Sequence, residues 1–312
     1  MWCARGRWKD PSPAALKWPR SSTCKPCALP PAAPEPRTTE MLVSIVTTVE
    51  TDTEILLPRN VGRAHYAAIL QRLHAVNPDL VAAIHEGDGP KPLTCSDILN
   101  GRSNRDGTRL EPGTPYYLRV TGLTPDVSQA LLKALVEKPP AAIELLHHPL
   151  RVTGATADAA GHGWAGAANY ESLAARQMLP GGSIPKQVTM QFASPTAFKQ
   201  AGRQMPLPLP DLVFGSLVER WNRFSPLALS PEMRRFGAEM LALTRYRLQS
   251  RPVQQKNGAL RIGGVGTATY RALGGDRYWL ATMQMLAEFA RYSGVGVQTA
   301  TGMGQARRLE DN

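Results

Sequence analysis

A chain of 312 residues that is 43% hydrophobic and 20% charged has globular composition and enough length for two domains of common size. No run of eighteen apolar residues occurs, and the N-terminus lacks the order of a secretory signal, so we expect a cytoplasmic protein rather than a membrane or exported one. The formal charge of +11 favours a polyanionic partner, although a solvated basic face would give the same charge.

Residues 1–40 have no helical or strand periodicity. They carry eight prolines and three tryptophans, so we expect a disordered arm that builds no core of its own. Cys24 and Cys27 in this arm have the spacing of metal ligands. Structural zinc usually takes four ligands, however, and neither Cys3 nor Cys95 forms a second pair. We therefore expect no metal site and no cofactor.

The elements predicted between residues 41 and 155 follow a β-α-β-β-α-β order. Alternating apolar residues predict the strands, and apolar residues three and four positions apart predict the helices. Asn77 and Pro78 form a favourable helix start, because the asparagine can cap the helix and the missing proline N–H would be unpaired anyway. The predicted elements are strand 42–57, helices 61–76 and 78–84, strands 92–95 and 116–123, a helix beginning at 124, and strand 142–153.

The same order recurs after a Gly- and Ala-rich connection over 156–182. Asn257-Gly258 between two long strands supplies the positive φ angles of a tight hairpin. We predict an α+β fold of two tandem ferredoxin-like (RRM-like) domains, 41–155 and 183–312, each a four-stranded antiparallel sheet backed by helices. The elements predicted in the second domain are strand 187–193, helices 211–223 and 232–243, strands 246–255 and 259–273, helix 277–291 and strand 305–309.

A glycine-rich segment lies between the last predicted helix and the last predicted strand. Residues 294–304 contain two Gly-apolar-Gly triplets separated by five residues. Dinucleotide-binding and phosphate-loop motifs need their glycines after a strand and at the start of a helix, so neither motif fits. A second glycine group, residues 263–266, interrupts a strand and predicts a bulge.

The 294–304 segment resembles the glycine-rich loop of the repeat-associated RNA-binding proteins of CRISPR systems. Within that superfamily it is similar to the repeat-processing endoribonucleases of the sixth numbered Cas family, and the resemblance covers nearly all of residues 41–309. It implies that the loop helps to shape an RNA-binding groove. The other similar segments are 77–80, 85–91, 94–96, 191–199, 206–210 and 216–222.

The resemblance also implies a reaction and the residues for it. Members of this family cut RNA without a metal ion: the ribose 2′-hydroxyl attacks the adjacent phosphate, leaving a 2′,3′-cyclic phosphate and a 5′-hydroxyl. His85 and Lys91 occupy the family's catalytic positions. Histidine suits proton transfer because its ordinary pKa is about 6.5, and a lysine ammonium can face the phosphate charge. The family's tyrosine would fall at Leu70, so Tyr66, one turn earlier, or His65 beside it is a candidate replacement.

Each of these residues also has a plainer interpretation. His85 fits a surface histidine favoured by a helix C-terminus, and Lys91 fits an exposed loop lysine. His65 and His74 are expected on the surface of the long helix. An isolated arginine is commonly a solvated charge, but a set beside the glycine-rich loop can contact phosphates. The candidate RNA-binding residues are Gly294, Gly296, Gly302, Gly304, Lys199, Arg203, Arg234, Arg235, Arg291, Arg307 and Arg308.

The expected partners are CRISPR repeat RNA, as precursor and as processed guide, and subunits of a CRISPR effector complex; no membrane partner is expected. The missing tyrosine keeps a second interpretation open, in which the chain is a non-catalytic subunit that holds processed RNA. A third is an RNA-binding module unrelated to CRISPR.

Overall fold

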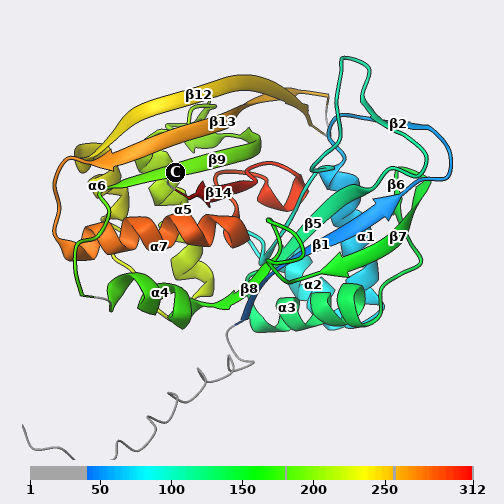
Figure 1. Ribbon diagram of the computed structural model, residues 1–312, viewed down its shortest axis with the longest axis horizontal. Helices are drawn as coiled ribbons and strands as arrows, with labels where there is room; N and C mark the ends of the chain where they lie inside the picture. The colour runs from blue at the N-terminus through cyan, green and yellow to red at the C-terminus, as the bar shows by residue number, and fades with distance from the viewer. Residues whose placement is uncertain (1–40, 180, 256–257, 311–312) are drawn as a thin grey trace, which may run out of the picture. The chain divides into compact units, whose positions relative to one another are not determined.

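The computed structural model describes residues 41–179, 181–255 and 258–310. The expected disordered arm, with Cys3, Cys24 and Cys27, lies outside the described residues, as does Asn257. No helix within these ranges is long and apolar enough to cross a membrane. The predicted α+β class is confirmed, because helices pack against two antiparallel sheets (Figure 1).

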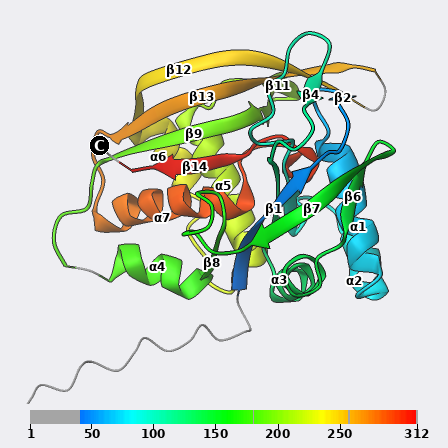
Figure 2. The ribbon, with the colours of Figure 1, turned by 45° about the vertical axis from the view of Figure 1, so that its right-hand side comes forward.

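The first sheet contains the strands β1 (Met41–Glu50), β3 (Leu93–Cys95), β5 (Tyr116–Gly122), β6 (Ala142–Leu145), β7 (His148–Thr156) and β8 (Gly166–Asn169). Its order is β3-β5-β1-β7-β6, with β8 pairing to the start of β1. The β3-β5-β1-β7 part is a ferredoxin-like unit, to which β6 and β8 are additions. One face is covered by α1 (Gly62–His74), α2 (Pro78–Glu86) and α3 (Pro125–Leu132) (Figure 2).

The second sheet repeats this plan with the strands β9 (Gln187–Thr196), β12 (Leu241–Gln254), β13 (Leu260–Ala272) and β14 (Ala306–Leu309). Its order is β12-β13-β9-β14, in which each strand has the same place as β3, β5, β1 and β7 in the first sheet. The helices α5 (Pro210–Phe224), α6 (Met233–Met240) and α7 (Arg277–Ser293) pack on one face, leaving the other free of helices (Figure 1).

Several boundaries differ from the sequence predictions. The strand predicted over 42–57 is β1 followed by β2 (Ile55–Leu57), which pairs with β4 (Thr108–Leu110) in a separate small sheet. The strand predicted over 142–153 is the β6–β7 hairpin, because Leu146 and His147 adopt φ angles of 51° and 69° and reverse the chain. The helix predicted over 232–243 ends at Met240, and β12 begins at the next residue.

The connection over 156–182 is more structured than its composition indicates. It contains β8 and α4 (Tyr170–Met178), whose start is capped by Asn169: its side chain accepts the Ser172 N–H at 2.6 Å. The bulge predicted at residues 263–266 is confirmed, because the pairing of β13 with β9 shifts register between Gly264 and Gly266.

The two halves share buried contacts. Leu42 and Leu123 of the first half belong to the same buried apolar cluster as Phe192 and Trp221 of the second. The Thr121 hydroxyl donates to the Tyr292 carbonyl at 2.7 Å, and the Gln305 side-chain amide donates to the Cys95 carbonyl at 3.1 Å. These bonds bring β14 and the end of α7 against the first sheet.

Candidate cleavage loop and nucleic-acid interface

The helix α2 holds His85 in its last turn. The Asn77 side chain accepts the Leu80 N–H at 3.0 Å, and Pro78 occupies the first helical position, as predicted. The Gly87 N–H donates to the Ala83 carbonyl at 3.1 Å and marks the end of the helix. The His85 side chain is exposed, so it is accessible to a substrate.

Lys91 closes the C-terminal end of α2. Its ammonium donates to the Gly87 carbonyl at 2.6 Å, the Ile84 carbonyl at 2.8 Å and the His85 carbonyl at 3.3 Å. Carbonyl groups at a helix C-terminus lack partners within the helix and carry partial negative charge, so an ammonium is favourable there. Lys91 therefore ties the loop that follows His85 back onto the helix, a role that the sequence motif did not indicate.

Arg234 lies beside this loop. Asp88, Gly89 and Pro90 line a cavity of about 680 Å³ together with Arg234 and Arg223 of the second half. The Arg234 side chain crosses α5 at Gly215, where an added Cβ would lie 2.6 Å from the Arg234 Cζ atom. Its guanidinium makes no hydrogen bond or ion pair with any residue that the structure describes. Arg234, which has no polar partner among the described residues, therefore lies beside the loop that follows His85.

The residues considered for the third catalytic position lie on the inner side of α1. Leu70 is buried, and Tyr66 is half-buried against the apolar cluster between α1 and the first sheet. Burial raises the pKa of the Tyr66 phenol, with the nearby Cys95 thiol as a lesser cause, so the phenol stays protonated at neutral pH.

His65 is not the surface residue that we expected, because its side chain is only 1% exposed. It faces inward against β3, where its Nδ1 atom lies 3.0 Å from the Ser96 carbonyl. Burial lowers its pKa to about 4, so the ring is neutral. His74, by contrast, is exposed as expected.

The glycine-rich loop needs glycine at its close approaches. Gly296 has a φ of 78°, and an added Cβ would lie 2.3 Å from the Ala197 carbonyl oxygen. Gly302 has a φ of 101° and faces Gly62 at the start of α1, where an added Cβ on Gly62 would lie 2.4 Å from the Gly302 Cα. The loop therefore packs backbone to backbone against the first half of the chain.

Most N–H groups of this loop have protein acceptors. Those of Gly294, Gly296 and Gly304 donate to the Ala290 carbonyl, the Ser216 hydroxyl and the Pro195 carbonyl at 3.0, 2.9 and 3.0 Å. These glycines are buried, so in this structure they build the wall of a groove and do not offer free donors to a phosphate.

A half-buried carboxyl group joins α1 to the loop. Asp97 accepts the Gly62 N–H at 2.6 Å and the Asn60 side-chain amide at 3.2 Å, and it lies against Gly302. Burial raises the pKa of Asp97 to about 6, although the hydrogen bonds oppose this shift. The carboxyl group caps α1, whose Val61 side chain offers no cap.

The groove beside the glycine-rich loop is basic. Gln298 and Thr301 of the loop line a cavity of about 690 Å³ with Arg59, Arg63 and Arg105 of the first half. The adjoining cavity, of about 630 Å³, is lined by Gln305, Arg59 and Arg251. The sequence patterns did not predict a role for these arginines.

The strand β12 adds a row of arginines that was also missed. Arg245, Arg247 and Arg251 are exposed, and Arg247 is paired across the sheet with Thr267. Side chains two residues apart point to the same face of a strand, so the alternation of arginine in TRYRLQSR was the available signal.

The remaining basic candidates have different surroundings. Lys199 and Arg203 are exposed on the small hairpin of β10 (Phe198–Gln200) and β11 (Arg203–Met205). Arg235 is held in ion pairs with Glu239 at 2.8 Å and Glu232 at 3.9 Å, so its charge is already compensated. The sequence could not separate it from its neighbour Arg234, which has no ion-pair partner in the described ranges.

Arg307 is also engaged by the protein. It donates to the Gln191 side chain at 2.8 Å and the Gly163 carbonyl at 3.1 Å, and it lies 4.4 Å from the ring centroid of Trp164. Arg308 forms an ion pair with Glu288 at 3.3 Å. Arg291 lines a separate cavity. Over the described ranges, no three His, Cys, Asp or Glu side chains are arranged to hold a metal ion.

Comparisons with known proteins agree on one family. Residues 190–306 match the family model described as CRISPR-associated endoribonuclease Cas6. A Cas6 of Mycobacterium tuberculosis is 32% identical over 126 residues, which are 39% of this chain and 38% of the relative. The match thus spans well under half of that curated relative.

Solved structures cover more of the chain. A Cas6 product complex superposes with a TM-score of 0.71 and 28% identity, covering 86% of this chain and 100% of that one. Thermus thermophilus Cas6 gives 0.66 and 25%, covering 86% and 99%. In its two ferredoxin-like units and in the glycine-rich loop between α7 and β14, the chain is thus similar to CRISPR-associated endoribonucleases of the Cas6 family.

Proposed function

We propose that the chain is a metal-independent endoribonuclease that cleaves CRISPR precursor RNA within its repeats. The observation that carries the proposal is the exposed His85 at the end of α2, followed by a loop that Lys91 holds and that lines a cavity with Arg234. The similar Cas6 proteins named above support the choice of RNA as substrate.

The proposed reaction moves two protons. The ribose 2′-oxygen loses a proton as it bonds to phosphorus, and the leaving 5′-oxygen gains one as its bond to phosphorus breaks. We assign the first transfer to the His85 imidazole. The Tyr66 phenol, which its raised pKa keeps protonated, is the candidate donor for the second. We assign to Arg234 the cation that faces the charge gathering on the phosphate, since Lys91 is engaged by helix carbonyls.

The RNA path that we propose runs from the cleavage loop to the basic groove beside the glycine-rich loop. Arg59, Arg63 and Arg105 line the groove, and the arginines of β12 extend the positive surface. Arginines contact phosphates without reading sequence, so this surface would bind and position the repeat. We propose further that the protein acts in the cytoplasm and delivers its product to CRISPR effector subunits.

A second function is favoured by two observations: the position of the family's tyrosine holds a buried leucine, Leu70, and Lys91 is occupied by main-chain carbonyls. Both weaken the catalytic site, so the alternative is a non-catalytic subunit that keeps the fold and holds processed guide RNA. This subunit would bind repeat RNA with a steep salt dependence and never break it.

Incubation with the cognate repeat RNA in EDTA tests the proposal. We expect a product with a 2′,3′-cyclic phosphate, and no cleavage when the nucleotide at the cut carries a 2′-deoxyribose. His85→Ala should lower the cleavage rate by about 100-fold or more, since a positioned acid or base contributes about 10²–10⁴. Arg234→Gln should lower it by about 10-fold, the equivalent of about 1.4 kcal/mol.

Matched variants control for general damage. His74→Ala removes an exposed histidine of α1, and Arg109→Gln removes an arginine that is paired with Glu54 on the surface. Both should cleave at the wild-type rate. Wild-type cleavage by His85→Ala would refute the site, whereas tight binding without any cleavage by the wild type would establish the non-catalytic alternative.

A further inference from the structure

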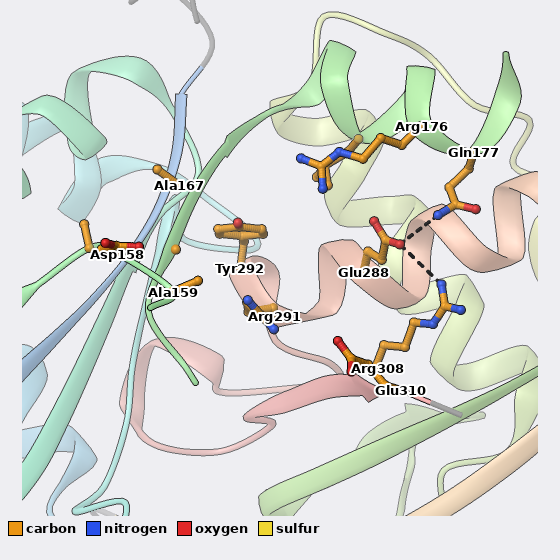
Figure 3. Close-up of a pocket in the computed structure, with 13 residues that line it drawn as sticks. Asp158, Ala159, Ala167, Arg176, Gln177, Glu288, Arg291, Tyr292, Arg308 and Glu310 are labelled. Carbon is orange, nitrogen blue, oxygen red and sulfur yellow. Dashed lines mark hydrogen bonds and ion pairs between the residues drawn. The ribbon is translucent and has the colours of Figure 1, made fainter. Parts of the chain in front are cut away.

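A cavity of about 910 Å³ lies apart from the cleavage loop, between α4, α7 and the segment around β8 (Figure 3). Arg176 comes from α4, Arg291 and Tyr292 from α7, and Gly166 from β8. The volume is ample for a phosphate group, whether it is free or part of a nucleotide.

Three polar groups of this cavity have no polar partner among the residues that the structure describes. Arg176, Arg291 and the Tyr292 hydroxyl make no hydrogen bond or ion pair with any residue in the described part of the chain. Arg308 differs, because it is neutralised by Glu288, which also accepts from Gln177 at 2.7 Å, as the dashed lines in Figure 3 show. The unpaired donors are therefore those at the β8 side of the cavity.

More positive charge lies behind these donors. Arg119 is fully buried and donates to the Ser44 hydroxyl at 2.8 Å and to the Gln305 side chain, but its Nη2 atom has no partner among the described residues. Burial, together with the charges of Arg291 and Arg307, lowers the pKa of Arg119 to about 9. The Arg119, Arg291 and Arg307 guanidinium groups thus lie close enough for their charges to interact, and none of them forms an ion pair with a described residue.

The acidic groups of the cavity do not cancel this charge. Glu288 is already paired, and Asp158 accepts the Ala160 N–H at 2.9 Å within its own loop. Glu310 lies at the end of the described chain beside Arg308 and is exposed. Neither Asp158 nor Glu310 forms an ion pair with Arg176 or Arg291, both of which lie in the described part of the chain.

Gly166 keeps the space in front of the donors open. An added Cβ there would lie 3.3 Å from the Tyr292 hydroxyl and 3.6 Å from an Arg291 Nη1 atom. A larger side chain would fill the place where a ligand meets both groups. An arginine fork and a neutral hydroxyl that converge on one open space match the oxygens of a phosphate group.

We propose that this cavity binds a phosphate group through Arg291, Tyr292 and Arg176, with Arg119 and Arg307 strengthening the positive field behind them. The phosphate is either a phosphodiester of bound RNA, a source that rests on the proposed function, or free inorganic phosphate. In both cases the anion would relieve the repulsion among the arginines at the seam between the two halves.

Thermal unfolding in sodium phosphate and in sodium chloride of equal ionic strength tests the phosphate chemistry without RNA. Phosphate should raise the unfolding midpoint of the wild type and of Arg109→Gln above that in chloride. The rise should be absent in Arg291→Gln, which removes the fork, and in Gly166→Val, which fills the space and keeps every charge. Arg291→Gln removes a charge and Gly166→Val adds bulk, so a folding defect caused by only one of these changes would not remove the effect of phosphate in both variants.

Binding of a repeat RNA with a 2′-deoxyribose at the cut identifies the source. If RNA supplies the phosphate, Arg291→Gln should reduce the slope of log affinity against log salt by about 0.7–0.9, so a fourfold rise in salt costs the variant about 2.6–3.5-fold less affinity than it costs the wild type. An unchanged slope assigns the site to free phosphate. If the wild type unfolds at the same midpoint in phosphate and in chloride, and the slope is unchanged in Arg291→Gln, the proposal is overturned. The thermal-unfolding experiment needs no RNA, so it tests the phosphate site even if the proposed RNA function fails.

Discussion

Replacing Lys91 by methionine separates two roles for this residue. The geometry makes Lys91 a cap of α2, because its ammonium donates to three carbonyls at the end of the helix. Methionine keeps much of the side-chain length and removes both the charge and the donors. If Lys91 acts as a cap, the substitution should destabilise the protein and loosen the loop after His85.

The size of the effect follows from the contacts. A hydrogen bond to a charged group contributes about 1.5–3 kcal/mol, and the interaction with the helix dipole about 0.3–1 kcal/mol. Lys91 is only half-buried, and water replaces it on the carbonyls, so we expect a loss of about 1–2 kcal/mol in the free energy of unfolding. For a protein of this size, that lowers the melting temperature by about 2–8 °C.

Urea unfolding, hydrogen exchange and cleavage should be measured together. We expect faster amide exchange at Gly87, lower stability and slower cleavage in Lys91→Met, with stability partly restored in Lys91→Arg. Lys186→Met is the matched control, since the side chain of this exposed lysine makes no hydrogen bond or ion pair with the described residues. Slower cleavage with unchanged stability and amide exchange would refute the capping role. It would indicate instead that the Lys91 ammonium acts on the scissile phosphate.

The pH dependence of stability should reflect two titratable groups with opposite effects. The contribution of His65, whose pKa is lowered to about 4, is lost as the pH falls from 6.5 towards 4, whereas that of Asp97, whose pKa is raised to about 6, is lost as the pH rises through 6. Asp97→Asn should therefore make the free energy of unfolding, measured by urea titration, fall more steeply as the pH is lowered. An unchanged dependence on pH would contradict the raised pKa of the carboxyl group. Gly62→Ala should cost about 1–3 kcal/mol because its Cβ would meet Gly302, while Gly154→Ala, with open space around it, should stay within about 0.5 kcal/mol in the same assay.

Local patterns were sufficient to predict the repeated fold. The cap and proline at Asn77 and Pro78 act within one helical turn, and the bulge at residues 263–266 follows from glycine within one strand, so both were predicted correctly. The α4 helix was missed because alanine and glycine dominate its surroundings, although Asn169 was a readable cap. Its helical state depends on Tyr170 and Leu173 packing into the second core.

The sequence by itself determined the order of the strands and helices of the two ferredoxin-like units, the position of His85 at a helix end and the place of the glycine-rich loop, because these depend on neighbours a few residues apart. Only the tertiary structure decided which charges are paired. His65 became a buried neutral group, Lys91 a helix cap and Arg234 a cation without an ion-pair partner in the described part of the chain, through contacts between distant segments. Burial and pairing depend on what the folded chain brings together, so the cavity in front of Arg291 could not be read from spacing.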